Sequence, residues 1–257
     1  MIGGSGLYAL LDKATEVTVE TPYGAPSDAI TVSQIDGRRV AFLPRHGKAH
    51  QHPPHRIPYR ANLWALRSLG VRQILAPCAV GGLRPELGAG TFVLPDQLVD
   101  RTSGRTQTFY DVGAVHVSFA DPYCPVGRAA VMAAGSTVDV VDGGTMVVVE
   151  GPRFSTRAES RWYSDLGFSL VNMTGHPEAL LARELALCYT AIALVTDLDA
   201  GVEGGAAVTQ EEVFRVFGEN TARMRDLLFE VVGRLPATRE CPCPNTLEGI
   251  ELPFELP

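Results

Sequence analysis

Short apolar runs alternate with amphipathic stretches along the chain, and this alternation predicts a series of strands and helices. The strand-like runs are residues 30–35, 40–44, 73–80, 144–150, 168–171 and 189–196. The helical patterns cover residues 57–69, 126–134, 156–166, 178–188 and 211–234. The first two runs flank Asp36-Gly37, a dipeptide typical of tight hairpin turns. Strands that alternate with helices predict an α/β fold around a buried sheet.

Length and composition narrow the class of protein. The 257 residues suffice for one large α/β domain, and we expect a single domain over 1–257 with an irregular, Pro-rich tail from about residue 235. The net charge of −7 argues against nucleic acid or an anionic membrane as partner. We find no apolar run of membrane-spanning length and no basic start of a signal peptide. Five cysteines, an odd number, predict reduced thiols and a cytoplasmic location.

Two groups of potential metal ligands can be interpreted without a metal. His46, His50, His52 and His55 lie close together, but their spacing matches no common structural zinc pattern and no cysteine is near. We therefore expect a polar active-site loop there. Cys241 and Cys243 form a C-P-C pair that suits a redox or metal motif, although we favour a surface turn.

Asp197 and Asp199 directly follow the apolar core of the 189–196 run. Ligands of open α/β sheets bind outside the carboxyl ends of the strands. Residues two apart on a regular strand point to the same side, so the two carboxyl groups are expected to lie together. Such a pair can accept the N–H groups of an amine, or one member can hold a proton and donate it. The alternative is a solvated strand end or a helix N-cap.

Three segments carry groups that suit an oxyanion. Gly3-Gly4-Ser5-Gly6 follows a very short strand, where exposed backbone N–H groups and one hydroxyl fit phosphate, although a plain tight turn fits equally well. Arg45 offers a planar fork of donors, and His46 a further donor. Thr174 follows another strand and can donate its hydroxyl.

Phe154 and Met173 are the candidates for apolar contact with a ligand. Phe154 can stack on a planar base or simply pack in the core. Met173 can cover the face of a sugar or belong to an ordinary loop. We find no GxSxG motif and no evident nucleophile–base pair, so covalent acyl transfer is disfavoured. The combination indicates group transfer between phosphate and a small molecule that carries a base.

Nine segments resemble the trimeric nucleoside phosphorylases, specifically the methylthioadenosine branch. They are GGSGL (3–7), TPYGAPSD (21–28), RHG (45–47), YRANLWAL (59–66), DQLVDRT (96–102), ADPYCP (120–125), GTMVVVEGPRFSTRAES (144–160), NMTGHPEA (172–179) and TDLDAG (196–201). The resemblance implies a three-layer α/β/α fold with a mixed, partly barrelled central sheet, and a homotrimer. It also implies phosphorolysis of a purine nucleoside, with inorganic phosphate as co-substrate and no metal or organic cofactor.

The resemblance also implies roles for individual residues. The implied phosphate contacts are Ser5, Arg45, His46, Cys78, Ala79 and Thr174. The implied contacts to the nucleoside are Phe154 and Met173 beside base and ribose, and Asp197 and Asp199 at the purine N7 and 6-amino group. His116 would reach the 5′ pocket of the neighbouring subunit. We assign substrate selectivity to Ser155 and Gln210.

Three positions differ from the family pattern and keep alternatives open. Cys78 stands where Thr or Ser is usual, Gln210 where the methylthioadenosine branch has an apolar residue, and Gly175-His176 is similar to relatives that act on 6-oxopurines. The expected reaction converts 5′-methylthioadenosine to adenine and 5-methylthioribose-1-phosphate. The alternative is a purine nucleoside phosphorylase acting on adenosine, inosine, guanosine or methylthioinosine. A non-catalytic nucleotide-binding module is the third possibility.

Overall fold

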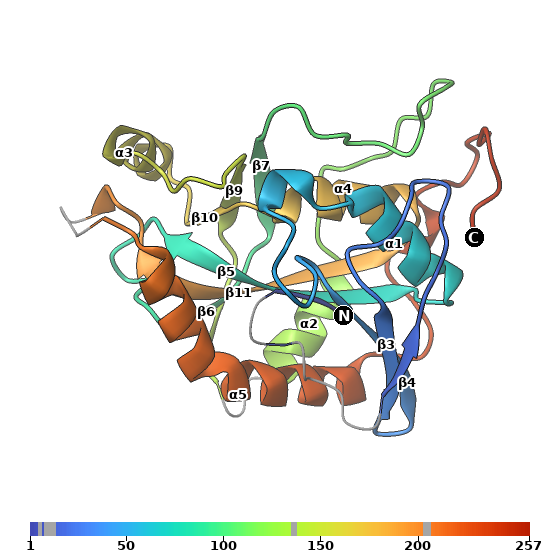
Figure 1. The fold of residues 1–257 in the computed structure, drawn as a ribbon, viewed down its shortest axis with the longest axis horizontal. Helices are drawn as coiled ribbons and strands as arrows, with labels where there is room; N and C mark the ends of the chain where they lie inside the picture. Colours follow the sequence, from blue (N-terminus) through green and yellow to red (C-terminus); the bar gives the residue numbers. More distant parts are fainter. Residues whose placement is uncertain (5–6, 8–13, 135–137, 203–206) are drawn as a thin grey trace.

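A central seven-stranded sheet organises the chain (Figure 1). The computed structural model describes residues 1–4, 7, 14–134, 138–202 and 207–257. The strand order is β7 (Gln97–Arg101), β9 (Thr145–Val149), β10 (Leu170–Asn172), β5 (Gln73–Gly82), β11 (Cys188–Leu198), β6 (Phe92–Leu94) and β8 (Val140–Asp142). The long strands β5 and β11 are parallel neighbours in the middle of this sheet, while β10 and β6 pair antiparallel with them.

A second, four-stranded sheet precedes the first in sequence. Its order is β1 (Ile2–Gly3), β4 (Arg38–Pro44), β3 (Ile30–Ile35) and β2 (Thr15–Val17). Asp36 and Gly37 join β3 to β4 with φ angles of 49° and 75°, so the hairpin prediction is confirmed. Strand β1 pairs with β4 and also lies against β5, which brings the segment after β4 close to the central sheet.

Helices cover both faces of the central sheet (Figure 1). One face carries α1 (Tyr59–Ser68) and α4 (Gly175–Glu184), and the other carries α2 (Pro125–Ala134) and α5 (Gln210–Arg234). Helix α3 (Arg157–Asp165) lies near one end of the sheet, and short 3-10 helices span Pro54–Arg56 and Cys243–Asn245. The three-layer α/β/α prediction is confirmed, but the described strands form two mixed sheets and no closed barrel.

The core has two main apolar clusters, one on each face of the sheet. Strand β11 contributes to both, because alternate residues of a strand point to opposite faces. Ala191, Ala193 and Val195 belong to the cluster shared with α1 and α4. Ile192 and Leu194 belong to the cluster shared with α2 and α5. A strand buried on both faces reads as a continuous apolar run, which is the pattern that the sequence shows.

Several boundaries differ from the sequence prediction. Strand β11 extends to Leu198, and the helix expected over 178–188 spans Gly175–Glu184, with non-helical angles at His176. Strands β2, β6 and β8 were not predicted, because three residues are too few to show a period. None of the described helices combines the length and the apolar character needed to cross a membrane.

Candidate active site

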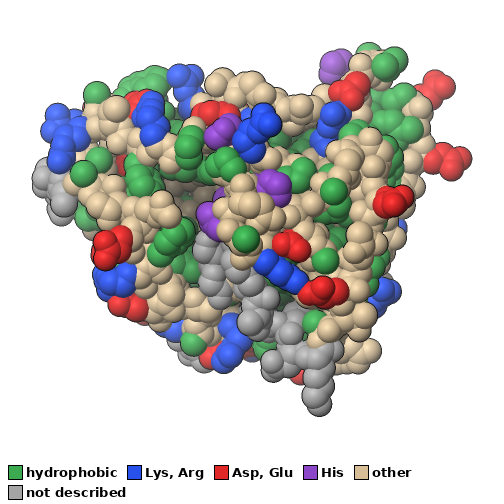
Figure 2. Space-filling model, in the orientation of Figure 1, with side chains coloured by type: hydrophobic (Ala, Val, Ile, Leu, Met, Phe, Trp, Pro, Cys, Tyr) green, Lys and Arg blue, Asp and Glu red, His purple; other side chains and the backbone are tan. Residues whose placement is uncertain are grey.

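A cavity of about 370 Å³ lies along the second half of β5 and the carboxyl end of β11. It opens on the face seen in Figure 2, where apolar and histidine side chains border a hollow. Eleven residues predicted for the site line it: Arg45, His46, Cys78, Ala79, Phe154, Ser155, Met173, Thr174, Asp197, Asp199 and Gln210. Segments far apart in sequence therefore meet here, as the strand-end argument predicts.

The two aspartates enter the cavity beside a glycine. The register between β11 and β5 shifts between Val195 and Asp197, so Thr196 is an extra residue on the bulged strand. Asp197 and Asp199 both line the cavity despite this irregularity. A Cβ placed on Gly81 would lie 3.2 Å from Oδ1 of Asp197 and 3.4 Å from Cβ of Asp199. The absence of a side chain at Gly81 thus leaves the space that the carboxyl groups occupy.

Burial makes both carboxyl groups hold protons more readily. Removal from water raises the pKa of Asp197 to about 6, partly opposed by the Thr196 hydroxyl, which donates to its Oδ2 at 2.8 Å. The pKa of Asp199 is also raised by burial, and the Ser160 and Ser155 hydroxyls moderate that rise. Within the described part of the chain, Oδ2 of Asp199 is buried and has no hydrogen-bond partner. A ligand donor is therefore the natural partner of this oxygen.

Arg45 is held by an acid that the sequence argument did not single out. Its Nε donates to Oε2 of Glu178 at 2.7 Å and its Nη2 to Oε1 at 2.8 Å, and both side chains are buried. Nη1 and Nη2 also donate to the carbonyls of Pro77 and Ile2. Burial lowers the pKa of Arg45, but the Glu178 carboxylate more than offsets this and the pKa is raised overall. Most of the guanidinium N–H groups expected to bind phosphate are thus used within the protein, and one N–H of Nη1 remains for a ligand.

His46 is fixed as one tautomer. Its Nδ1 lies 2.8 Å from the carbonyl oxygen of His52, which can only accept, so Nδ1 carries the hydrogen. Burial lowers the pKa of His46 to about 4, so the ring is neutral near pH 7. Nε2 of the neutral ring is then an acceptor. The sequence argument expects His46 to donate to an oxyanion, whereas the neutral ring offers Nε2 as an acceptor.

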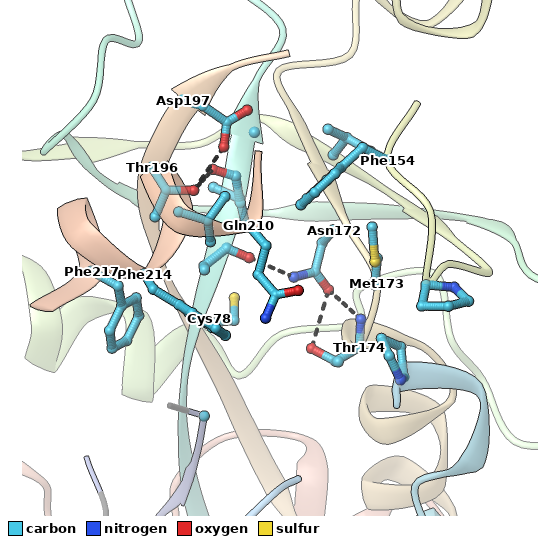
Figure 3. Close-up of a pocket in the computed structure, with 18 of the residues that line it drawn as sticks. Cys78, Phe154, Asn172, Met173, Thr174, Thr196, Asp197, Gln210, Phe214 and Phe217 are labelled. Carbon is cyan, nitrogen blue, oxygen red and sulfur yellow. Dashed lines mark hydrogen bonds between the residues drawn. The ribbon is translucent and has the colours of Figure 1, made fainter. Parts of the chain in front are cut away.

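Asn172 organises the corner that contains Thr174. Its side chain donates to the carbonyl of Ala79 at 3.0 Å and accepts from the backbone N–H groups of Thr174 at 2.8 Å and Gly175 at 2.6 Å (Figure 3). The nearby Cys78 thiol is buried, which raises its pKa to about 12 and keeps it neutral. Cys78 therefore contributes no thiolate nucleophile to the cavity.

The first turns of α5 supply an apolar wall with one polar member. Gln210, Val213, Phe214 and Phe217 line the cavity at a spacing that places them on one face of the helix. In Figure 3 the Gln210 side chain extends into the cavity, and Phe214 and Phe217 lie opposite Phe154 and Met173. Thr209 caps this helix by accepting from the Glu212 N–H, so Gln210 is not the cap.

Arg105 ties together the loops that carry Phe154 and Met173. Its Nη1 donates to the carbonyls of Met173 and His176 at 2.9 and 2.6 Å, and its Nη2 to the carbonyl of Glu150 at 2.7 Å. Its Nε also pairs with the Glu150 carboxylate at 3.0 Å. The guanidinium is almost completely buried, so these loops are joined by charge-assisted bonds in a dry environment.

Two predicted site residues are not part of the cavity described here. Ser5 lies outside the described residues. His116 is exposed and lines a separate depression, formed by residues 113–116 and residues 249–253 of the tail.

The sequence argument missed Glu178, Asn172, Arg105 and the apolar members of the α5 wall. Glu178 and Asn172 stand inside the NMTGHPEA segment, which was the available signal. Arg105 gave no signal, because most of its partners are backbone carbonyls and its one carboxylate partner, Glu150, lies 45 residues away in sequence.

Comparison with known proteins places this geometry in a family. The profile of the phosphorylase superfamily matches residues 1–233. A purine nucleoside phosphorylase of Streptomyces coelicolor is 60% identical, with 100% of this chain and 96% of that protein covered. An S-methyl-5′-thioadenosine phosphorylase of Mycolicibacterium smegmatis is 59% identical, covering 100% of this chain and 98% of that protein. The structure of a Schistosoma mansoni methylthioadenosine phosphorylase with adenine superposes with a TM-score of 0.86 at 38% identity, covering 90% of this chain and 89% of that one. The chain therefore belongs to the phosphorylase superfamily.

Proposed function

We propose that this protein converts 5′-methylthioadenosine and inorganic phosphate to adenine and 5-methylthioribose-1-phosphate. The observation that carries the proposal is an acid that can hold its proton, Asp197, in the same cavity as the polar corner of Thr174 and His46. In Figure 3, Asp197 and Thr174 lie at opposite ends of the cavity. A base that leaves at one end and an oxyanion that attacks from the other fit this separation.

Cleavage of the C1′–N9 bond leaves negative charge on the purine and positive charge on the sugar. Protonated Asp197 donates to N7 of the departing adenine, which is general acid catalysis. The unpartnered oxygen of Asp199 accepts from the 6-amino group. Phe154 and Met173 cover the base and the ribose from the side opposite α5. These contacts orient the purine so that N7 faces the acid.

Phosphate occupies the corner formed by Arg45, His46, Cys78, Ala79 and Thr174. Ser5, which lies outside the described residues, stays a proposed phosphate contact. The spare Nη1 hydrogen of Arg45 donates to the phosphate oxygens. The Thr174 hydroxyl also donates to them, after giving up its long 3.5 Å contact with Oδ1 of Asn172. Bound phosphate also stabilises the positive sugar in the transition state, because opposite charges attract strongly in a site shielded from water. One phosphate oxygen then forms the new bond to C1′ as the bond to N9 breaks.

Proton balance gives His46 a role of its own. Hydrogen phosphate carries one proton that the sugar phosphate product does not keep, whereas the adenine gains one. Neutral His46 accepts the phosphate proton at Nε2, and Asp197 supplies the proton of the base. Exchange with solvent after product release returns Asp197 to its protonated form and His46 to its neutral form. The cycle requires no metal and no organic cofactor, with phosphate as co-substrate.

The 5′ substituent faces the α5 wall. Val213, Phe214 and Phe217 offer an apolar surface that suits a methylthio group, and Gln210 adds one donor and one acceptor. Ser155, beside Asp199, contributes to selectivity at the base. The name of the Streptomyces coelicolor relative favours a second candidate, phosphorolysis of purine nucleosides with a 5′-hydroxyl. Gln210 is the residue in this wall that can pair with such a hydroxyl.

The assembly is proposed to be a cytoplasmic homotrimer. The exposed loop that carries Val112, which is 75% exposed, and His116 projects from the body of the chain. A loop of this kind suits a head-to-tail interface, in which His116 enters the 5′ pocket of the next subunit and the ring closes with cyclic symmetry. Sedimentation at micromolar concentration should give three times the chain mass of 27.6 kDa. A sedimenting species of single-chain mass would refute the trimer.

A substrate panel tests the reaction. Methylthioadenosine, adenosine, inosine and methylthioinosine are each incubated with the protein, with and without phosphate, and the free base is measured by chromatography. We expect adenine from methylthioadenosine at the highest kcat/KM, and only with phosphate present. Faster release of hypoxanthine from inosine or methylthioinosine would establish the 6-oxopurine alternative. No base release from any member would leave a binding module.

A further inference from the structure

The four cysteines outside the active site meet in one buried cluster. Cys124 precedes α2, Cys188 begins β11, and Cys241 and Cys243 belong to the tail after α5. Their Sγ atoms all lie within 4.8 Å of one another, and Cys188 and Cys241 are 3.4 Å apart. Each residue is at most 6% exposed. The surface turn expected for Cys241 and Cys243 is therefore wrong, because both side chains point into the protein.

We propose that this cysteine cluster, Cys124, Cys188, Cys241 and Cys243, is a structural zinc site. Zinc prefers four thiolates in a tetrahedron, and Zn–S bonds of about 2.3 Å place the sulfurs roughly 3.8 Å apart. The mutual closeness of all four sulfurs allows one metal ion to bind them all. Because the sulfurs already lie within 4.8 Å of one another, a small movement of side chains completes the site without a change of fold. Four protein ligands leave no position open for catalysis.

The surroundings suit negatively charged sulfurs. Cys124 stands just before the first residue of α2, where the positive end of the helix dipole favours a thiolate. The backbone N–H of Gly127 points to Sγ of Cys124 at 3.5 Å. Arg239, two residues before Cys241, donates to the carbonyl of Ala186 and so brings a positive charge to this region. Four thiolates around a divalent cation carry a net negative charge, and these groups offset part of it.

The site would fix the tail to the body of the protein. Cys241 and Cys243 join the tail to the amino end of β11, opposite the strand end that carries Asp197. Farther along, Phe254 stacks on Tyr110 at a centroid distance of 5.4 Å and meets Trp64 at 5.6 Å. Zinc would thus be a further anchor of residues 235–257, and its role is structural. Its removal should loosen the tail before it affects the cavity.

Metal analysis of the full-length protein tests the proposal directly. The protein is purified under reducing conditions without chelator, dialysed against zinc and then against buffer, and analysed for metal by mass spectrometry. We expect about one zinc per chain. Replacement by cobalt should give the thiolate-to-cobalt charge-transfer bands and the visible bands of a tetrahedral sulfur site. Neither measurement depends on a variant that folds poorly.

Matched variants locate the metal. Cys243→Ser should lower zinc retention against a chelator about tenfold or more, and should speed cleavage of the tail by protease. Cys78→Ser removes the fifth cysteine, outside the cluster, and should leave the zinc content unchanged. Two results would overturn the proposal. One is a native chain mass four hydrogens below that of the reduced chain, which would show two disulfides. The other is a fully reduced protein that retains no zinc after dialysis.

Discussion

Replacing Asp197 with Asn should make the protein more stable and the enzyme much slower at neutral pH. The folded protein raises the pKa of this carboxyl from 3.8 to about 6 because burial disfavours the ionised form. Near neutral pH the folded protein therefore contains an ionised Asp197 carboxylate that burial disfavours. Asn has nearly the same shape, carries no charge, and its oxygen can still accept from the Thr196 hydroxyl.

The magnitude follows from the pKa. A rise from 3.8 to about 6 corresponds to about 3 kcal/mol against the ionised carboxylate. The side chain is not fully buried, so water screens part of this cost and about 1–3 kcal/mol is expected. The destabilisation by the Asp197 carboxylate depends on pH. It is absent below the unfolded-state pKa, grows as the pH rises toward about 6, and is constant above pH 6. A chain of this size gains roughly 2–4 °C in Tm per kcal/mol.

The assay compares thermal unfolding of wild type and Asp197→Asn from pH 4 to pH 8, without substrate. The variant should melt several degrees higher at pH 8, and the difference should shrink toward pH 4. Asp139→Asn, at an exposed position, is the control and should shift Tm little at any pH. Turnover of methylthioadenosine by Asp197→Asn should fall about a hundredfold or more, the usual scale for a positioned acid. A variant that melts lower at pH 8, or a difference independent of pH, would refute the burial argument. Unchanged turnover would refute the acid assignment.

Three further outcomes follow from the site. Glu178→Gln leaves the buried guanidinium of Arg45 without its counter-ion, so the free energy of unfolding should fall by about 3–5 kcal/mol. Added phosphate should then raise the Tm of the variant more than that of wild type. An equal rise in Tm with phosphate in both proteins would contradict this. Gln210→Val should widen the preference for methylthioadenosine over adenosine about tenfold in kcat/KM, if Gln210 pairs with the 5′-hydroxyl; an unchanged ratio would remove Gln210 from the 5′ pocket. At saturating phosphate, kcat/KM for methylthioadenosine should fall tenfold per pH unit above the pKa of Asp197, because the protonated acid is lost. That pKa should be about 6 or higher, because the bound phosphate anion raises it further. The same decline in Asp197→Asn would assign the pH dependence to another group.

Local patterns in the sequence predicted much of the fold. The Asp36-Gly37 hairpin, α1 and α5 follow from turn residues and from apolar spacing, both of which act over a few residues. The three-residue strands β6 and β8 were missed because they depend on pairing with distant strands. Residue identity combined with family resemblance selected eleven of the residues that line the cavity, including both aspartates.

The partners of those residues were beyond the sequence. Nothing near Arg45 indicates that Glu178, 133 residues later, occupies its fork. The neutral tautomer of His46 depends on a carbonyl, which every residue carries. The sequence predicted a surface turn at Cys241 and Cys243, because Cys124 and Cys188, which complete the cluster, lie far away in sequence. Long-range contacts of this kind are set by the packed sheet, and a local pattern does not contain them.

The fate of phosphate tests the central claim most directly. The protein is incubated with methylthioadenosine and isotopically labelled inorganic phosphate, and adenine and the sugar products are measured together. The account predicts labelled 5-methylthioribose-1-phosphate in the same amount as adenine, and no adenine without phosphate. Adenine formed at the same rate without phosphate, accompanied by free methylthioribose, would show that water is the nucleophile and would contradict the account.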